Sequence, residues 1–340
     1  MAQTARRWYL AKHANADIEA DTFEFREEPI PALKDGEMLV RSIYLSLDAT
    51  NRVWISTWDQ YMDPVNPGEP MRGFVCGEVV ESKNPAFQAG QIVAGMHSWS
   101  DYFVTDGATF SAFPALPGID LSEAFGTLAI AGPTAYVGLI NVGEVKAGET
   151  VVVSAAAGAV GMMVGQIAKL KGCRTIGIAG GPEKCARLTE EFGYDEAIDY
   201  RNEDVAARLK ALAPDGIDLL YENVGGQILD AGLAAMKNFG RVVICGLIST
   251  YNQSGGPVPG PYMFRNVIMR RLRIEGFVIL DYVEEMPGIL QELAGWMMEG
   301  KLHFRVHVVD GLEQAPDALK MLYTGANQGK LMVRIGNEPG

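Results

Sequence analysis

The chain has 340 residues, of which 48% are hydrophobic and 21% are charged, and its formal net charge is −13. Two domains are the natural expectation at this length, and this composition can bury a sizeable core, which excludes a disordered chain. The negative charge repels phosphate backbones and anionic lipid headgroups. We therefore expect no nucleic-acid partner and no membrane partner.

The cysteines and the N-terminus indicate a cytoplasmic protein. Residues 1–12 contain no apolar run followed by a small-residue cleavage site. The uncharged stretch at residues 150–168 starts like a strand and contains three glycines, so we do not interpret it as a membrane helix. No C-x-x-C pair occurs, and widely spaced thiols fit a reducing compartment. The four cysteines are Cys76, Cys173, Cys185 and Cys245.

The N-terminal third is predicted to be mostly β-structure. Residues 37–44 alternate polar and apolar side chains, as in a half-buried strand, and residues 77–81 and 90–94 resemble shorter strands. Frequent prolines and glycines are typical of a small barrel or sandwich. Several aromatic and sulfur-containing side chains of this region either line an apolar substrate site or pack in a satellite core. These residues are Trp54, Trp58, Tyr61, Met62 and Trp99.

From Phe125 onward, strands alternate with helices. The expected strands are residues 149–154, 174–179, 196–200, 217–222 and 240–245, and the expected helices are residues 160–171, 182–192, 205–213 and 227–236. This alternation predicts a doubly wound parallel sheet with helices on both faces. A last strand at residues 272–279 is expected to close the sheet.

The C-terminal tail returns to β-character. It is expected to contain strands at residues 305–310 and 330–335 with a helix at 315–323 between them. We expect this tail to fold back onto the N-terminal domain. The predicted domains are therefore residues 1–125, completed by residues 302–340, and residues 126–301.

The strongest local motif is Ala156-Ala-Gly-Ala-Val-Gly161, which follows an apolar strand and starts a helix. This is the context of a dinucleotide-binding turn, in which Gly158 admits the pyrophosphate and Gly161 permits close helix packing. The helix N-terminus offers N–H groups to the phosphates. Ala156 replaces the first glycine of the fingerprint, so an ordinary tight turn is the alternative. The predicted cofactor-binding residues here are Ala157, Gly158, Ala159, Val160 and Gly161.

The end of the second predicted strand indicates which dinucleotide binds. An NAD site usually places a carboxylate there, on the ribose 2′-hydroxyl. This chain has Ala179-Gly-Gly181 instead, followed by Lys184. A small uncharged turn with a lysine suits the 2′-phosphate of NADPH. The alternative is that Lys184 is a solvated residue of the first helical turn, like Glu183.

No metal site or nucleophile is predicted. Catalytic zinc needs about three Cys, His or carboxylate ligands, and no histidine is paired with a cysteine at ligand spacing. His303 and His307 are four residues apart, but in a β-like segment, where such residues are not stacked as on a helix. The chain has no G-x-S-x-G motif, and hydride transfer from a cofactor needs no protein nucleophile.

Six motifs in order together resemble the zinc-free medium-chain dehydrogenases/reductases. Among these, the chain is most similar to the branch of prostaglandin reductases (leukotriene B4 12-hydroxydehydrogenases) and bacterial curcumin and 2-alkenal reductases, over nearly its whole length. The motifs are Ala157-Gly-Ala-Val-Gly161, Glu183-Lys184, Asp199-Tyr200, Glu222-Asn-Val-Gly-Gly226, Cys245-Gly-Leu-Ile-Ser-Thr-Tyr-Asn252 and Gly325-Ala-Asn-Gln-Gly-Lys330.

The resemblance implies an α/β protein with a GroES-like, β-rich catalytic domain and a Rossmann domain that binds NADPH. It implies that Lys184 and Tyr200 hold the 2′-phosphate end, that Asn223 lies near the cofactor, and that Asn327 reaches it from the returning tail. It also implies a homodimer. The residues expected to line the nicotinamide side are Cys245, Gly246, Leu247, Ile248, Ser249, Thr250, Tyr251, Phe277, Val278 and Ile279.

Two segments can be compared with relatives. Zinc-dependent members carry Gly-His-Glu where this chain has Gly73-Phe-Val-Cys-Gly77, which supports zinc independence. Members of the reductase branch often carry Asp-Pro-Tyr-Met-Arg where this chain has Asp48-Ala-Thr-Asn-Arg52. Thr50 thus replaces a tyrosine of the substrate pocket, which leaves the substrate open.

The family chemistry is hydride delivery from NADPH to the β-carbon of an α,β-unsaturated aldehyde or ketone. We expect a small apolar substrate, with Tyr251 as hydrogen-bond donor toward its carbonyl oxygen or, alternatively, as a packing or ribose-positioning residue. Thr50 and Tyr262 are further candidates for the substrate pocket. The alternative functions are a quinone reductase, a carbonyl/alcohol redox enzyme and a non-enzymatic NADPH-binding protein.

Overall fold

The computed structural model describes residues 4–253 and 258–338 of the chain. It divides into two compact units. The β-rich unit comprises Met1–Ala129, Asn252–Gly255 and Val306–Gly340, and the Rossmann unit comprises Ile130–Tyr251 and Gly256–Arg305. Each unit is treated separately below.

The β-rich unit is built on a seven-stranded sheet. Its strand order is β14-β15-β3-β4-β5-β7, and β6 also pairs with β3. A separate antiparallel pair is formed by β1 (Thr4–Leu10) and β2 (Phe23–Pro29). The strands of the larger sheet are β3 (Met38–Ser46), β4 (Arg72–Ser82), β5 (Ile92–Ser98), β6 (Tyr102–Thr105), β7 (Phe110–Ala112), β14 (Val306–Asp310) and β15 (Lys330–Arg334). The unit also contains α1 (Thr50–Trp54), α2 (Leu121–Gly126), η6 (Leu312–Gln314) and α10 (Ala315–Thr324).

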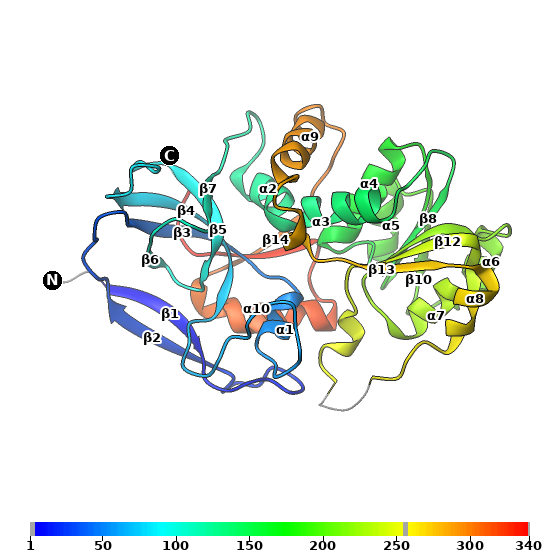
Figure 1. The fold of residues 1–340 in the computed structure, drawn as a ribbon, viewed down its shortest axis with the longest axis horizontal. Coiled ribbons are helices and arrows are strands. Elements are labelled where there is room, and N and C mark those ends of the chain that lie inside the picture. Colours follow the sequence, from blue (N-terminus) through cyan, green and yellow to red (C-terminus); the bar gives the residue numbers. More distant parts are fainter. Residues whose placement is uncertain (1–3, 254–257, 339–340) are drawn as a thin grey trace. The chain divides into compact units, whose positions relative to one another are not determined.

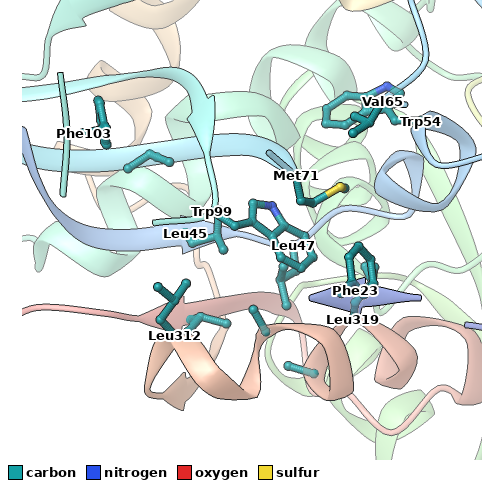
Figure 2. Packing of buried hydrophobic residues seen from close by; sticks show 14 of the residues in the cluster. Phe23, Leu45, Leu47, Trp54, Val65, Met71, Trp99, Phe103, Leu312 and Leu319 are labelled. Carbon is teal, nitrogen blue, oxygen red and sulfur yellow. The ribbon is translucent and has the colours of Figure 1, made fainter. Parts of the chain in front are cut away.

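The core of this unit joins side chains from both ends of the sequence. Figure 2 shows Trp99 beside Leu45, with Leu312 and Leu319 from the C-terminal tail in the same buried cluster. Complete burial of a leucine stabilises a fold by about 1.5–3 kcal/mol. The tail therefore contributes directly to the stability of the N-terminal core.

Two of the aromatic residues considered for a substrate site are core residues instead. Trp99 and Trp54 are buried and belong to the same hydrophobic cluster (Figure 2). Trp54 lies at the end of α1, where its indole N–H donates to the Tyr61 hydroxyl oxygen at 3.0 Å. Of the two roles considered for these side chains, packing in a core is therefore correct for Trp54 and Trp99.

The Rossmann unit contains a six-stranded sheet in which every neighbouring pair is parallel, in the order β10-β9-β8-β11-β12-β13. The strands are β8 (Thr150–Val153), β9 (Arg174–Ala179), β10 (Glu196–Asp199), β11 (Ile217–Glu222), β12 (Met236–Ile244) and β13 (Arg273–Gly276). The strand order reverses between β8 and β11. Ligands of doubly wound sheets bind at such a point, at the carboxyl ends of the strands. The predicted α/β fold class is confirmed.

Helices cover both faces of this sheet. On one face α4 packs on β8 and β9 and against α3, and on the other α6 packs against α7 (Figure 1). Between the second face and the sheet lies a core that includes Leu209, Leu233 and Leu220. The helices are α3 (Gly132–Tyr136), η2 (Val137–Val142), α4 (Ala159–Leu170), α5 (Pro182–Glu190), α6 (Val205–Leu212), α7 (Gly226–Ala235), η3 (Ile248–Thr250), η4 (Tyr262–Arg265), α8 (Asn266–Arg270), η5 (Ile279–Tyr282) and α9 (Met286–Met298).

Several elements differ from the expectations. The strand expected at residues 272–279 is the shorter β13, which ends at Gly276 and, among the described residues, pairs with β12 at the edge of the sheet. Leu121–Val142 is one long apolar helical stretch in which α turns alternate with the π turns η1 (Thr127–Ala131) and η2. It is long and apolar enough to cross a membrane, but most of it is buried, and core helices meet the same criterion.

Candidate cofactor site

The turn between β8 and α4 has the shape of a phosphate-binding site. Gly158 is the extended N-cap residue of α4. A Cβ on Gly161 would lie 2.4 Å from the carbonyl oxygen of Ala155, so only glycine fits where the helix meets the turn. The first turn of an α-helix presents N–H groups without intrahelical partners, and here these belong to Ala159, Val160 and Gly161. This end of α4 is therefore suited to a pyrophosphate.

The missing first glycine of the fingerprint is compensated by its neighbour. Ala155 adopts a left-handed backbone, with φ of 48°. Ala156 is buried, and its N–H donates to the carbonyl oxygen of Ile178 in β9 at 3.0 Å. The tight turn is thus formed by alanines, and Ala157 follows it as a half-buried residue.

Cations gather where β9 and β10 end. Lys184 lies in the first turn of α5 and is half-buried. Burial lowers the pKa of Lys184, and the nearby positive charges of Arg201 and Arg187 lower it further. Arg187 is paired with Glu183. Arg201 was not predicted from the sequence, although it directly follows Tyr200 at the end of β10.

Tyr200 packs on the small turn beside these cations. A Cβ on Gly180 would lie 2.8 Å from the Tyr200 ring, which is 44% exposed. Asp199 links the two strand ends, because it accepts hydrogen bonds from the backbone N–H of Gly181 at 2.7 Å and of Arg201 at 3.0 Å. The structure thus brings Lys184, Tyr200 and the Gly-Gly turn together.

A polar network lies at the point where the strand order reverses. Ser154, just after β8, donates its hydroxyl to Glu222 at 3.0 Å and accepts the backbone N–H of Asn223 at 2.7 Å. The Asn223 side chain donates to the carbonyl oxygen of Ser154 at 2.7 Å. Asn223 is therefore held by two bonds at the carboxyl edge, as its predicted place near the cofactor requires.

Glu222 organises the loop after β11. One oxygen of its buried carboxyl group accepts the backbone N–H groups of Val224 at 2.6 Å and Gly225 at 2.7 Å. The other oxygen, Oε2, is buried without a hydrogen-bond partner. Burial raises the pKa of Glu222, against the opposing effect of these donors. No role for the Glu222 side chain was predicted from the sequence.

The loop after β12 folds onto the loop after β11. The backbone N–H of Cys245 donates to the carbonyl oxygen of Glu222 at 2.9 Å, and that of Ile248 donates to Asn223 at 3.1 Å. The Ser249 hydroxyl donates to the carbonyl oxygen of Val224 at 2.6 Å, and the Thr250 hydroxyl closes the turn on Leu247 at 2.8 Å. These bonds give the segment from Cys245 through Gly246 to Tyr251 a defined shape.

The Tyr251 hydroxyl lies over the backbone of its own loop. It accepts the N–H of Leu247 at 3.2 Å, and a Cβ on Gly246 would lie 3.4 Å from it. The Cys245 thiol is protonated at neutral pH, because burial raises its pKa to about 12. The buried Tyr221 hydroxyl is its hydrogen-bond neighbour.

The other predicted nicotinamide-side residues follow β13. Phe277 packs on the apolar helical stretch, because a Cβ on Gly138 would lie 2.8 Å from its ring. The Phe277 ring also meets Tyr282 edge-on, with centroids 6.4 Å apart. Val278 and Ile279 are half-buried. These three residues directly follow the end of β13, at the same carboxyl edge of the sheet as the loops described above.

The remaining predicted residues lie elsewhere. Thr50, in α1 of the β-rich unit, shares a short hydrogen bond with the Tyr61 hydroxyl. Asn327, also in that unit, donates its side-chain amide to the carbonyl oxygen of Gly329 at 2.8 Å. Tyr262, in η4 of the Rossmann unit, is 84% exposed.

The histidines take structural positions. His97 stacks on Phe103 with ring centroids 4.0 Å apart, and burial lowers its pKa to about 4. The His307 ring accepts the backbone N–H of Gln328 at 3.2 Å. Across residues 4–253 and 258–338, no three His, Cys, Asp or Glu side chains are grouped so that they could hold a metal ion.

Comparison with known proteins agrees with this arrangement. A family model described as the N-terminal domain of oxidoreductase matches residues 6–113, and one described as zinc-binding dehydrogenase matches residues 159–295. The NADPH-dependent curcumin reductase of Escherichia coli is 39% identical, over 99% of this chain and 98% of that protein. A 2-alkenal reductase (NADP(+)-dependent) of Nicotiana tabacum is 41% identical, over 89% of this chain and 88% of that protein.

A solved structure extends the likeness to the whole fold. The crystal structure of CurA in complex with NADPH from Vibrio vulnificus superimposes with a TM-score of 0.91 at 40% identity, covering 98% of this chain and 100% of that one. The resemblance noted in the motifs is thus confirmed. This chain belongs to the medium-chain dehydrogenase/reductase superfamily, in its reductase branch.

Proposed function

We propose that this protein is an NADPH-dependent reductase of the carbon–carbon double bond of α,β-unsaturated aldehydes or ketones. Relatives at about two-fifths identity are named curcumin reductase and 2-alkenal reductase, and both names specify NADP(H). NADPH would supply the hydride. The contribution of the chain is to bind the cofactor, to orient it and to stabilise the charge that develops on the substrate.

The preference for NADPH rests on the strand ends at β9 and β10. No carboxylate lies at the tip of β9, where the Gly-Gly turn leads into α5, and Lys184 and Arg201 are close enough for their charges to interact. Two cations favour a 2′-phosphate and offer nothing specific to a 2′-hydroxyl. This pair is the observation that carries the cofactor assignment, with Tyr200 packed beside it.

The glycine turn and the polar network hold the rest of the cofactor in this proposal. Residues from Ala157 to Gly161 bind the pyrophosphate through backbone N–H groups. Asn223 and the backbone between Cys245 and Tyr251, together with the segment Phe277–Ile279, form the nicotinamide side. Asn327 is proposed to reach the cofactor from the β-rich unit.

On the substrate side, charge develops on the carbonyl oxygen as hydride reaches the β-carbon, and a donor there lowers the barrier. We propose Tyr251 for this role, with the Leu247 N–H orienting its hydroxyl. Thr50 and Tyr262 are proposed to line the pocket of a small apolar substrate. The hydrogen bond between the hydroxyl groups of Thr50 and Tyr61 supports the assignment of Thr50, because it brings two polar groups together at that position.

We propose that the chemistry is zinc-independent, although one matching family model is described as a zinc-binding dehydrogenase. The segment Gly73–Gly77 lies in β4 and offers only Cys76 as a ligand type. Cys76 is buried, and burial raises its thiol pKa well above its usual range. A buried, protonated thiol is a poor metal ligand.

We further propose a cytoplasmic homodimer. The outer edge of β13 has no partner strand among the described residues, and such an edge readily pairs with a second chain. Large apolar side chains are exposed on elements next to it. They are Phe264, Ile268, Met269 and Val283.

The test is to follow NADPH oxidation with a panel of 2-alkenals, enones and quinones, with NADH in parallel, and to identify the products. Saturated aldehydes or ketones formed with NADPH support the proposal. Turnover of quinones alone would assign a quinone reductase. NADPH binding without turnover of any compound would assign a non-enzymatic binder.

A further inference from the structure

A hollow opens at the edge of the Rossmann sheet opposite to the cofactor loops. We call it the amino-edge hollow, because it lies at the amino ends of β8, β11, β12 and β13. Its volume is about 370 Å³. The residues used below that line it are Glu144, Lys146, Phe239, Arg241, Arg271 and Arg273. Nothing in the proposed reaction uses this edge of the sheet.

The backbone around the hollow is strained. Only four non-glycine residues of the described chain have positive φ, and three of them line this hollow: Glu144 at 47°, Phe239 at 64° and Arg271 at 51°. Such a backbone in a bulky residue like phenylalanine is an outlier. Strain of this kind costs of the order of 1–3 kcal/mol per residue and gathers at functional sites. One of the three, Arg271, is the left-handed C-cap of α8, whereas Glu144 and Phe239 lie outside helices.

The hollow is lined by more cations than carboxylates, and two of its cations form no ion pair within the described part of the chain. Arg273 pairs with Glu144 at 2.6 Å, and Arg241 pairs with Glu149 at 2.5 Å. The third carboxylate of the lining, Asp218, is paired with Lys237 at 2.9 Å.

Among the described residues, Lys146 and Arg271 form no ion pair, although both line the hollow. On a chain with net charge −13, this is a local site of attraction for an anion.

An exposed aromatic ring lies beside these cations. Phe239 is 71% exposed, and the Arg271 guanidinium lies 4.6 Å from its ring centroid. A ring that is not packed in the core and already carries a guanidinium can stack with a further planar group. We propose that the amino-edge hollow binds an aromatic anion, with its ring on Phe239 and its anionic group at Arg271 and Lys146. This site is separate from the cofactor site and does not depend on the proposed reaction.

Phenyl phosphate is a suitable probe, because it combines a ring with an anion. Binding is measured by ligand-observed NMR on the full chain saturated with NADP⁺, so that the cofactor site is filled. Inorganic phosphate and phenol carry one of the two features each. We expect phenyl phosphate to bind in the millimolar range and about fivefold more tightly than either fragment. Equal binding of phenyl phosphate and phosphate would overturn the proposal.

Matched variants locate the site. Arg271→Gln is expected to weaken phenyl phosphate binding about fivefold, whereas Lys210→Gln, at an exposed cation of α6 outside the hollow, leaves it unchanged. Phe239→Gly removes the ring and also relieves the left-handed strain, so it should abolish binding and raise Tm.

Binding of phenyl phosphate to Phe239→Gly with unchanged affinity would contradict the proposal. Size-exclusion chromatography completes the test. A loss of binding that coincides with dissociation of the oligomer would assign the hollow to a subunit interface instead and refute the site.

Discussion

Removing the two cations at the ends of β9 and β10 should change the cofactor preference without changing the fold. The substitutions are Lys184→Ala, Arg201→Ala and the double variant. Neither side chain belongs to the hydrophobic core clusters, so we expect each variant to fold. NADH lacks the 2′-phosphate, and its affinity should be unaffected by either change.

The magnitude follows from how much water surrounds each cation. A hydrogen bond from a charged donor contributes about 1.5–3 kcal/mol when it is protected from solvent. Lys184 is half-buried, so its removal should raise the Kd for NADPH about tenfold or more. Arg201 is exposed, and screening reduces its contribution to about 0.5–1 kcal/mol, or about two- to fivefold in Kd.

The assay is a titration of NADPH and NADH by cofactor fluorescence, which measures binding independently of turnover. Lys210→Ala is the matched control, because it removes an exposed positive charge from α6 in the same unit. The reasoning fails if the Kd values for NADPH and NADH rise by the same factor, since the cations would then bind a part common to both cofactors. It also fails if the unmodified protein prefers NADH.

Three further predictions concern single side chains. Tyr251→Phe removes the proposed donor, so kcat for an enone should fall about a hundredfold while the KM for NADPH changes little; a normal kcat with a raised KM would assign a positioning role. Gly161→Ala brings a Cβ to 2.4 Å from the Ala155 carbonyl oxygen and should destabilise the protein by about 1–3 kcal/mol in denaturant unfolding. The control Gly295→Ala adds a Cβ in open space and should not destabilise it. His97 has a folded-state pKa lowered to about 4, so the unfolded chain binds its proton first as pH falls. The free energy of unfolding should therefore decrease between about pH 6.5 and 4, by up to about 3 kcal/mol for this group, and His97→Gln should flatten that part of the curve.

Much of the Rossmann unit could be predicted because its strands are buried on both faces. Strands expected at residues 174–179 and 217–222 coincide with β9 and β11, which are almost entirely buried and therefore read as continuous apolar runs. The edge strand β13 was predicted three residues too long at its end and one residue too long at its start. Three of its four residues are exposed, so the pattern of apolar residues does not show where the strand ends.

The β-rich unit was harder to predict. β1 and β2 were missed because charged side chains such as Arg6, Arg7 and Glu27 interrupt their apolar pattern, and because β2 is largely exposed. The π turns between residues 127 and 142 have no sequence signal comparable to a cap or a proline. Trp99 illustrates the general difficulty, because its loop position gave no sign that the C-terminal tail would bury it.

Candidate site residues could be predicted where the backbone conformation or the cofactor restricts the residue type in the sequence. The glycines at 158 and 161 mark the turn, and the absence of a carboxylate at Gly180-Gly181 marks the cofactor. Arg201 and Glu222 were missed, because their importance arises from neighbouring parallel strands that are distant in sequence. Only the strand order shows that their strand ends lie beside β9 and β8.

Backbone strain connects the two edges of the Rossmann sheet. Ala155 is the only one of the four left-handed non-glycine residues in the described chain that lies at the phosphate turn, where it replaces the flexibility of a glycine. The other three surround the amino-edge hollow. A fold keeps such residues only where surrounding contacts hold them. At the carboxyl edge the strained residue lies in the turn that we propose to bind the phosphates of a dinucleotide. The same physical argument, together with Arg271 and Lys146, which form no ion pair with any described residue, supports the proposed second anion site at the amino edge.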